Sequence, residues 1–310
     1  MPLSSYGTAC RGIGLHGPCE CFGYNEIIVT ALPTLFVSHG APTLALEPRA
    51  TGAALARLGH ELPRPAAILM VSAHWETERP AVSAAEKPKT IHDFGGFPAE
   101  LYQLKYPAPG APELARRVEE VLGASGMTAD LDPRRGLDHG AWVPLRYLFP
   151  DADVPVTQLA IQPHLSPVHH YRVGEALRPL TQEGVLVIGS GSMTHNLREV
   201  RFDAPEGDAA AYVREFQDWI LRTIERNDVA ALLDYRSLAP AAVRAHPTDE
   251  HLLPLFVALG AAGVGSVAKR VTDEITYGVL AMDAYLFEPA HAATRDDDSR
   301  IADRVRVPSH

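Results

Sequence analysis

The sequence predicts an α/β fold, a single domain in which a central, mainly parallel or mixed β-sheet is flanked by helices on both faces. Four short apolar runs, each bounded by Gly, Pro or polar residues, are typical of strands that are buried on both faces. Amphipathic stretches separate these runs, so strands and helices alternate along the chain. Residues 32–287 contain neither an internal repeat nor a linker, which indicates one domain of about 255 residues.

The strands are assigned to runs rich in β-branched and other apolar residues. In chain order these runs are TLFVS (Thr34–Ser38), AILMVSA (Ala67–Ala73), VTQLAI (Val156–Ile161) and VLVIG (Val185–Gly189). A last strand is expected to run through Ile275–Phe287.

The helices are assigned to amphipathic stretches between and after the strands. They are predicted at Glu47–Leu62, Pro112–Gly123, Pro167–Gln182 and Ala209–Asn227. The apolar stretch Leu252–Ala268 contains Pro254 and three glycines and has too few large apolar residues for a membrane span of ~20 positions. It predicts a buried helix followed by a Gly-rich turn.

Both ends of the chain differ in composition from the part between them. Residues 1–31 carry Gly, Pro and Cys at irregular intervals, which predicts a poorly ordered N-terminal extension without the apolar core of a signal peptide. Residues 288–310 are polar and predict a charged C-terminal tail. The expected organisation is therefore an extension, a main domain over 32–287, and a tail.

The charge balance restricts the class of partner. The 310 residues include 28 Lys and Arg against 38 Asp and Glu, a formal charge of −10, and no stretch is rich in Lys or Arg. This balance argues against an electrostatic grip on nucleic acid or on a membrane surface. A small-molecule partner is expected.

The three cysteines, Cys10, Cys19 and Cys21, lie within the first 21 residues, so no disulfide framework holds the main domain together. This distribution suits a reducing cytoplasm. A metal clip formed by His16, Cys19 and Cys21 would lack a second ligand pair. An unstructured extension is therefore the favoured interpretation.

Three histidines follow predicted buried strands at the point where each strand ends. They are His39 in VSHG, His74 in VSAHW and His195 in GSGSMTHN. In open α/β sheets the ligand crevice lies outside the carboxyl ends of the strands, so these side chains can converge. One histidine in such a place is more often structural, but three of them indicate a site.

Two further segments add histidines. In HPTDEH the proline favours the first helical position, which places His246 near an N-cap and His251 in the opening turns of a helix. Five residues correspond to roughly 140° around a helix, so we do not expect both to bind one metal. His139 in DHGAW lies between a turn and the start of an apolar helix, where it can equally be a capping or loop residue.

Three neutral imidazoles suit Zn(II) and Fe(II) and leave coordination positions open for water or substrate. The pattern therefore predicts metal-assisted catalysis. A serine nucleophile is disfavoured, because no Gly-x-Ser-x-Gly elbow precedes Asp and His in the expected order. Nucleotide binding is disfavoured as well, because no Lys-Ser/Thr follows Gly189-Ser190-Gly191-Ser192 and no Gly-x-Gly-x-x-Gly opens a helix.

Seven short motifs occur in the order found in a known family. The chain resembles the class III extradiol ring-cleavage dioxygenases (LigB-type) over about Leu32–Phe287, and within them most closely the 4,5-DOPA extradiol dioxygenase branch. The motifs are SHGAP (38–42), SAHW (72–75), IHDFGGFP (91–98), YPAPG (106–110), LDHGAW (137–142), THNL (194–197) and HPTDEHLLPL (246–255).

The resemblance implies a non-haem metal-dependent enzyme that opens the ring of a DOPA-like catechol with O2, with residues 32–287 as its catalytic domain. It implies that His39, His74 and His251 bind the metal. His195 would be the acid/base residue and His139 a second active-site histidine. Fe(II) is expected for activity, and Zn(II) can occupy the site in the isolated protein.

Several alternatives stay open on the sequence. Glu250 is an adjacent carboxylate that can compete as a ligand. Side chains that can orient the metal-binding rings are Asp93, Asp138 and Asp249, and those that can wall the substrate ring, or simply belong to the core, are Trp75, Phe94 and Phe97. A zinc-dependent hydrolase and a non-catalytic metal-binding relative are the alternative functions. The sequence also leaves open whether the protein forms a homo-oligomer.

Overall fold

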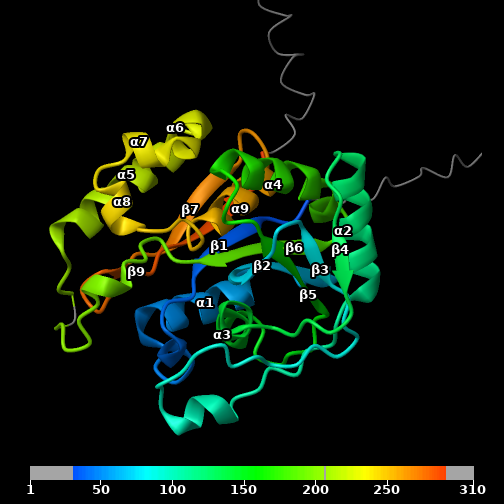
Figure 1. The fold of residues 1–310 in the computed structure, drawn as a ribbon, viewed down its shortest axis with the longest axis horizontal. Helices are drawn as coiled ribbons and strands as arrows, with labels where there is room; N and C mark the ends of the chain where they lie inside the picture. Colours follow the sequence, from blue (N-terminus) through cyan, green and yellow to red (C-terminus); the bar gives the residue numbers. More distant parts are fainter. Residues whose placement is uncertain (1–30, 206, 291–310) are drawn as a thin grey trace, which may run out of the picture.

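A computed structural model of the chain describes residues 31–205 and 207–290. Within them lies an eight-stranded sheet with the order β4-β3-β5-β2-β6-β1-β10-β7 (Figure 1). The strands are β1 (Thr34–Ser38), β2 (Ala67–Glu76), β3 (Ala81–Ser83), β4 (Asp130–Asp132), β5 (Val156–Ile161), β6 (Val185–Gly191), β7 (Val267–Thr272) and β10 (Ala284–Glu288). The predicted class, a single α/β domain with a mixed sheet, is confirmed.

The centre of the sheet is parallel and its flanks are not. Strands β5, β2, β6 and β1 run parallel to one another. At the two sides, β3 is antiparallel to β5 and parallel to β4, whereas β10 is antiparallel to β1 and β7 to β10. The parallel strands are almost entirely buried, as their continuous apolar runs predict. Their carboxyl ends meet at one edge of the sheet, and the segments that carry His39, His74 and His195 begin there.

Helices cover both faces of the sheet. The α9 helix (Leu253–Ala262) contacts β6 and β1, and α4 (Pro167–Gln182) packs along α9. On the opposite face α3 (His139–Leu148) contacts β2, and α1 (Arg49–Glu61) packs against α3 (Figure 1). The remaining helices are α2 (Pro112–Ala124), α5 (Ala211–Glu225), α6 (Val229–Leu233), α7 (Tyr235–Leu238) and α8 (Ala242–Ala245), with single-turn 3₁₀ segments at Pro42–Ala45, Ala99–Gln103 and Leu197–Glu199.

The predicted β1, β5 and α4 have the observed bounds, and the other predicted helices differ by no more than two residues at either end. The prediction of one continuous last strand over Ile275–Phe287 was wrong. It is broken into β8 (Ile275–Thr276), β9 (Leu280–Ala281) and β10. The physical reason is the turn at Tyr277 and Gly278, whose φ values of 52° and 74° are incompatible with a strand.

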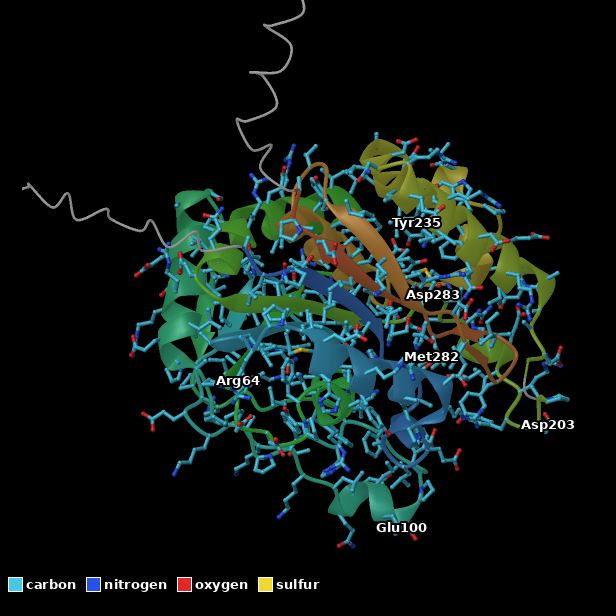
Figure 2. All side chains as sticks on the ribbon, turned by 180° about the vertical axis from the view of Figure 1, so that it is seen from behind. Arg64, Glu100, Asp203, Tyr235, Met282 and Asp283 are labelled. Carbon is cyan, nitrogen blue, oxygen red and sulfur yellow. The ribbon has the colours of Figure 1, made fainter. Side chains whose placement is uncertain are left out.

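The backbone of Asp283, just before β10, is hydrogen-bonded to the end of β1 next to the site. The backbone carbonyl of Asp283 accepts hydrogen bonds from the N–H and the hydroxyl of Ser38, at 3.1 and 2.8 Å. The Ser38 hydroxyl in turn accepts one from the N–H of Met193. Burial raises the pKa of the Asp283 carboxyl to about 7. Figure 2 shows Asp283 among the packed side chains of the molecule, in contrast to Glu100 and Asp203 at its periphery.

The described residues include no helix long and apolar enough to cross a membrane. The disfavoured metal clip of His16, Cys19 and Cys21, and the predicted disorder of the two ends, concern residues outside the described range apart from positions 31 and 288–290. The domain boundaries at 31/32 and 287/288 therefore stay predictions.

Candidate metal and catalytic centre

The three histidines predicted as metal ligands come together at the carboxyl edge of the sheet. His39 directly follows β1, His74 lies near the end of β2, and His251 lies in the turn before α9. One ring nitrogen of each lies within 4.8 Å of the others, and the Nε2 atoms of His39 and His74 are 2.9 Å apart. Segments 35 and 177 residues apart along the chain thus place three imidazoles around one point.

The second nitrogen of each ring faces a hydrogen-bond acceptor. The Nδ1–H of His39 donates to the Ser190 hydroxyl at 3.0 Å, and that hydroxyl donates to the Gly140 carbonyl at 2.5 Å. The Nδ1–H of His251 donates to Glu250 at 3.1 Å, and Nδ1 of His74 lies 3.6 Å from Asp93. Such partners fix the tautomer that leaves Nε2 free for a metal, so this donor set fits a divalent ion.

The pKa values of all three imidazoles are lowered. Burial is the main cause for each ring, and the neighbouring histidines add to it. The pKa of His74 falls to about 4 although Asp138 and Asp93 oppose the shift. The three rings are therefore neutral at pH 7, which is the form that binds metal ions.

The predicted helix start between His246 and His251 was wrong, because the helix begins after both histidines. His246 is the C-cap of α8, and α9 begins only at Leu253, with Pro254 in its first turn, so His251 precedes the helix. A proline does occupy the first turn of this helix, but it is Pro254 and not Pro247. The expectation that His246 and His251 do not share a metal agrees with their positions, because the buried Nε2–H of His246 donates to the Met193 carbonyl at 2.8 Å.

Glycines in β6 allow the His251 segment to approach the sheet. The carbonyl of His251 accepts a hydrogen bond from the N–H of Ser192 at 2.9 Å, and a Cβ at Gly191 would lie 1.9 Å from that carbonyl oxygen. A Cβ at Gly189 would lie 2.2 Å from the carbonyl oxygen of Pro254. The Gly189-Ser190-Gly191 sequence, which resembles a phosphate loop only superficially, thus permits close backbone packing, and its serine supports His39.

We therefore expect Gly191→Ala to displace His251 and lower metal affinity at least tenfold, the range seen when support of a metal ligand is lost. Metal content after dialysis, measured by mass spectrometry, and the melting temperature check this. Gly123→Ala is the matched control, because a Cβ at this exposed position in α2 meets nothing within 4 Å. Full metal retention in Gly191→Ala would show that the close approach does not position His251.

His139 is the first residue of α3, and Asp93 holds it in place. One carboxylate oxygen of Asp93 accepts from the backbone N–H of His139 at 2.9 Å and the other from its Nδ1–H at 3.0 Å. Burial raises the pKa of Asp93, but these hydrogen bonds and the charge of His139 outweigh it and hold the pKa at about 2. The ring of His139 lies with its centroid 4.0 Å from that of His74.

His195 lies on the other side of the cluster and stacks on His251. The ring centroids are 3.3 Å apart and the planes 12° from parallel. The backbone N–H of His195 donates to Ala245, and its Nδ1 lies 3.7 Å from Glu250. Burial lowers the pKa of His195 to about 4, helped by His246 and opposed by Glu250. Its imidazole is therefore neutral at pH 7 and able to accept a proton.

The structure separates the three candidate aspartates. Asp93 contacts the cluster directly. Asp138 is the buried N-cap of α3 and accepts from the Ser72 hydroxyl at 2.6 Å, while its second oxygen accepts from Arg135 at 2.6 Å. The role suggested for Asp249 was wrong, because Asp249 binds Arg236 and the Tyr235 hydroxyl instead of an active-site ring.

The histidine cluster opens into a cavity of about 470 Å³. Phe94 and Phe97 line it, as suggested. Trp75 does not. Its ring packs against Ala81 and Ala160 and lies under the Arg135 guanidinium at 5.0 Å, because alternation along β2 turns it away from His74. The cavity also has walls that were not predicted, formed by Leu197, Val200, Phe202, Tyr277 and Leu280.

Comparisons with known proteins agree with this geometry. Residues 35–286 match the family model described as the catalytic LigB subunit of aromatic ring-opening dioxygenase. The chain is 43% identical to a Beta vulgaris protein named 4,5-DOPA dioxygenase extradiol, over 82% of this chain and 96% of that protein. An Escherichia coli K12 protein of the same name is 40% identical, over 82% and 93% of the two chains.

A solved structure shares the fold. The crystal structure of an uncharacterised Escherichia coli K12 protein superposes with a TM-score of 0.68 at 30% identity, over 82% of this chain and 99% of that one. The match of the family model covers all the histidines of the centre and the whole sheet apart from the first residue of β1 and the last two of β10. The chain therefore belongs to the LigB family of aromatic ring-opening dioxygenases and is a metal-dependent extradiol dioxygenase.

Proposed function

We propose that the protein uses Fe(II), held by His39, His74 and His251, to cleave a catechol ring beside its diol with O2. The observation that carries this proposal is the convergence of three neutral imidazoles, two of them buried and that of His74 half-buried, on one wall of a cavity, each with its second nitrogen facing an acceptor. A three-imidazole site leaves coordination positions free for a chelating substrate and for dioxygen. Fe(II) bound there would supply the electron transfer between catecholate and O2.

The proton chemistry is assigned to His195 and His139. A catechol must lose at least one phenolic proton, with an unperturbed pKa near ~10, before it chelates a metal. His195 lines the cavity as a neutral base and can accept that proton and later return it. His139 also lines the cavity, and Asp93 fixes its Nδ1–H, so its Nε2 is the nitrogen left to face substrate and oxygen.

The reaction balances without another reactant. One ring C–C bond beside the diol breaks, both atoms of O2 enter the product, and the ring is oxidised as dioxygen is reduced. The product is a ring-opened semialdehyde, and no external reductant is consumed. DOPA, named in the relatives, is one catechol to test, and the cytoplasm is the compartment we propose from the confinement of cysteine to the first 21 residues.

Oxygen uptake by the Fe(II)-loaded protein tests the proposal. With 4-methylcatechol, L-DOPA, caffeate and protocatechuate, we expect one O2 consumed per catechol cleaved and a yellow product for at least one of them. The Zn(II)-loaded protein is the control and is expected to consume none, because Zn(II) has no redox chemistry. Absence of uptake from a sample proven to retain Fe(II), or oxygen-independent turnover of an ester with Zn(II), would overturn the proposal.

A further inference from the structure

The cavity changes character with distance from the histidines. Beyond the five imidazoles its lining is apolar and comes from separate segments, which contribute Phe94 and Phe97, Leu197 with Val200 and Phe202, and Leu280. Leu197 and Phe202 are 62% and 74% exposed, so they form an apolar mouth in contact with solvent. An exposed aromatic ring at a cavity mouth can bury its area against a bound ligand.

The polar groups of this outer part already have partners. The Tyr277 hydroxyl is hydrogen-bonded to the Thr43 hydroxyl at 2.9 Å, and the Ser192 hydroxyl donates to the Thr194 carbonyl at 2.8 Å. Neither needs a ligand to satisfy it. The Ser192 hydroxyl would have to leave the Thr194 carbonyl to donate to a ligand, whereas either oxygen can be the donor in the bond between Tyr277 and Thr43.

Among the described residues, no Lys or Arg lines the cavity. Arg198 and Arg201 stand in the same loop as Leu197 and Phe202, but neither lines the cavity, and Arg201 pairs with Asp208 at 2.8 Å. The carboxylates next to the histidines, Asp93 and Glu250, add negative charge. A substrate carboxylate in the outer part would therefore lose its hydration without gaining a cation, which is unfavourable.

From these observations we propose that the outer part of the cavity, lined by Phe94, Phe97, Leu197, Val200, Phe202 and Leu280, is a subsite for an uncharged apolar substituent of the catechol. The preferred substrates are then neutral alkyl- or aryl-substituted catechols rather than catechols with a carboxylate on the side chain. This inference rests on the proposed function, because the histidine centre must hold the diol.

A matched series of catechols tests the subsite. We expect kcat/KM for 4-propylcatechol to exceed that for dihydrocaffeate, which carries a carboxylate on a chain of the same length, at least thirtyfold. From 4-methylcatechol to 4-propylcatechol we expect a rise of about fifteenfold, since each of the two added methylenes contributes about fourfold when buried. Dopamine and L-DOPA, tested in parallel, are expected to fall below 4-propylcatechol.

Binding without turnover gives a second readout. Calorimetric titration of the Zn(II)-loaded protein under argon is expected to give a lower Kd for 4-propylcatechol than for dihydrocaffeate and a negative heat-capacity change, the sign of apolar burial. Equal Kd values would overturn the inference even if turnover is not measurable. The comparison of Kd values therefore tests the subsite independently of ring cleavage.

Two variants test whether Phe202 and Leu197, at the mouth of the cavity, cause the preference for apolar substituents. Phe202→Ser is expected to lower the ratio of kcat/KM for the propyl over the methyl compound at least threefold, and Leu197→Arg to raise kcat/KM for dihydrocaffeate at least tenfold. Val264→Ser, at an equally exposed apolar position (79%) that does not line the cavity, is the matched control and should change neither. Both mouth residues are exposed, so these changes are not expected to unfold the protein.

The outcomes separate the two proposals. If dihydrocaffeate or L-DOPA is cleaved as efficiently as 4-propylcatechol, the subsite assignment fails while the proposed function stands. If no catechol is cleaved by the Fe(II)-loaded protein but 4-propylcatechol still binds more tightly than dihydrocaffeate, the proposed function fails while the apolar subsite stands. If neither cleavage nor the binding difference is found, both fail.

Discussion

His74→Ala is expected to lose the metal and, with it, ring-cleaving activity. His74 supplies one of the three imidazoles, and its Nε2 lies 2.9 Å from that of His39 at the point where the ligand atoms converge. Loss of a group that merely supports a ligand costs about 10–100-fold in metal affinity, so loss of a ligand should cost at least about 100-fold. The metal content per chain after dialysis, measured by mass spectrometry, checks this.

His60→Ala is the matched control for His74→Ala. It removes the same side chain from an exposed position near the end of α1, so metal content and oxygen uptake are expected to stay at the wild-type level. Circular dichroism of both variants shows whether the fold is kept. A His74→Ala protein that folds and retains a full equivalent of metal would remove His74 from the ligand set.

Much of the fold was predictable because the central strands are buried on both faces. A strand such as β5 is buried along its whole length, and its mostly apolar run lies between Pro155 and Gln162, so its bounds can be read directly. The flanking strands lack that signal. β3 and β4 have three residues each, and β7 exposes Val267 while carrying Lys269 and Arg270. Their pairing depends on neighbours that are distant in sequence, which local patterns do not reveal.

The convergence of His39, His74 and His195 followed from the topology, since each ends or follows a strand at one edge of the sheet. Which side chains support them did not follow. From the sequence, Asp249 and Asp93 are equally plausible supports, yet Asp249 binds Arg236 and Asp93 binds His139. Strand alternation at His74 was a usable signal that Trp75 points the other way.

The sequence does not show that β6 supports His39 and His251, and the reason here is a different one. Ser190 and Gly191 look like part of a loop, but they end the strand, where one holds His39 and the other makes room for the His251 carbonyl. Close backbone approach leaves no mark in a sequence other than a glycine, and many glycines occur for other reasons. Only the three-dimensional packing shows which glycine is required.

His195→Ala is expected to keep the metal while kcat falls by about 10²–10⁴-fold, the range that a positioned acid/base group contributes. His195 stacks on His251 but is not one of the three converging ligands, and Glu250 still accepts the Nδ1–H of His251 when His195 is removed. The ligand should therefore keep its orientation. Oxygen uptake per bound iron with 4-methylcatechol gives kcat independently of any difference in loading.

The comparison of His195→Ala with His74→Ala decides the assignment of roles. If His195 moves protons, its alanine variant still binds 4-propylcatechol in the Zn(II)-loaded form under argon with a Kd within about threefold of wild type, whereas His74→Ala has lost the metal that holds the diol. His195→Gln, which keeps a polar group of similar size but cannot accept a proton at neutral pH, should be as slow as the alanine variant. Restored turnover in His195→Gln would instead assign His195 to positioning, and equal metal loss in both alanine variants would place it among the ligands. His195 stacks on His251 with Glu250 beside both rings, which holds a neutral imidazole next to the set of His39, His74 and His251. Because ligand atoms of His195, Glu250 and His251 also lie within 4.8 Å of one another, metal retention in His195→Ala is the result that separates proton transfer from metal binding.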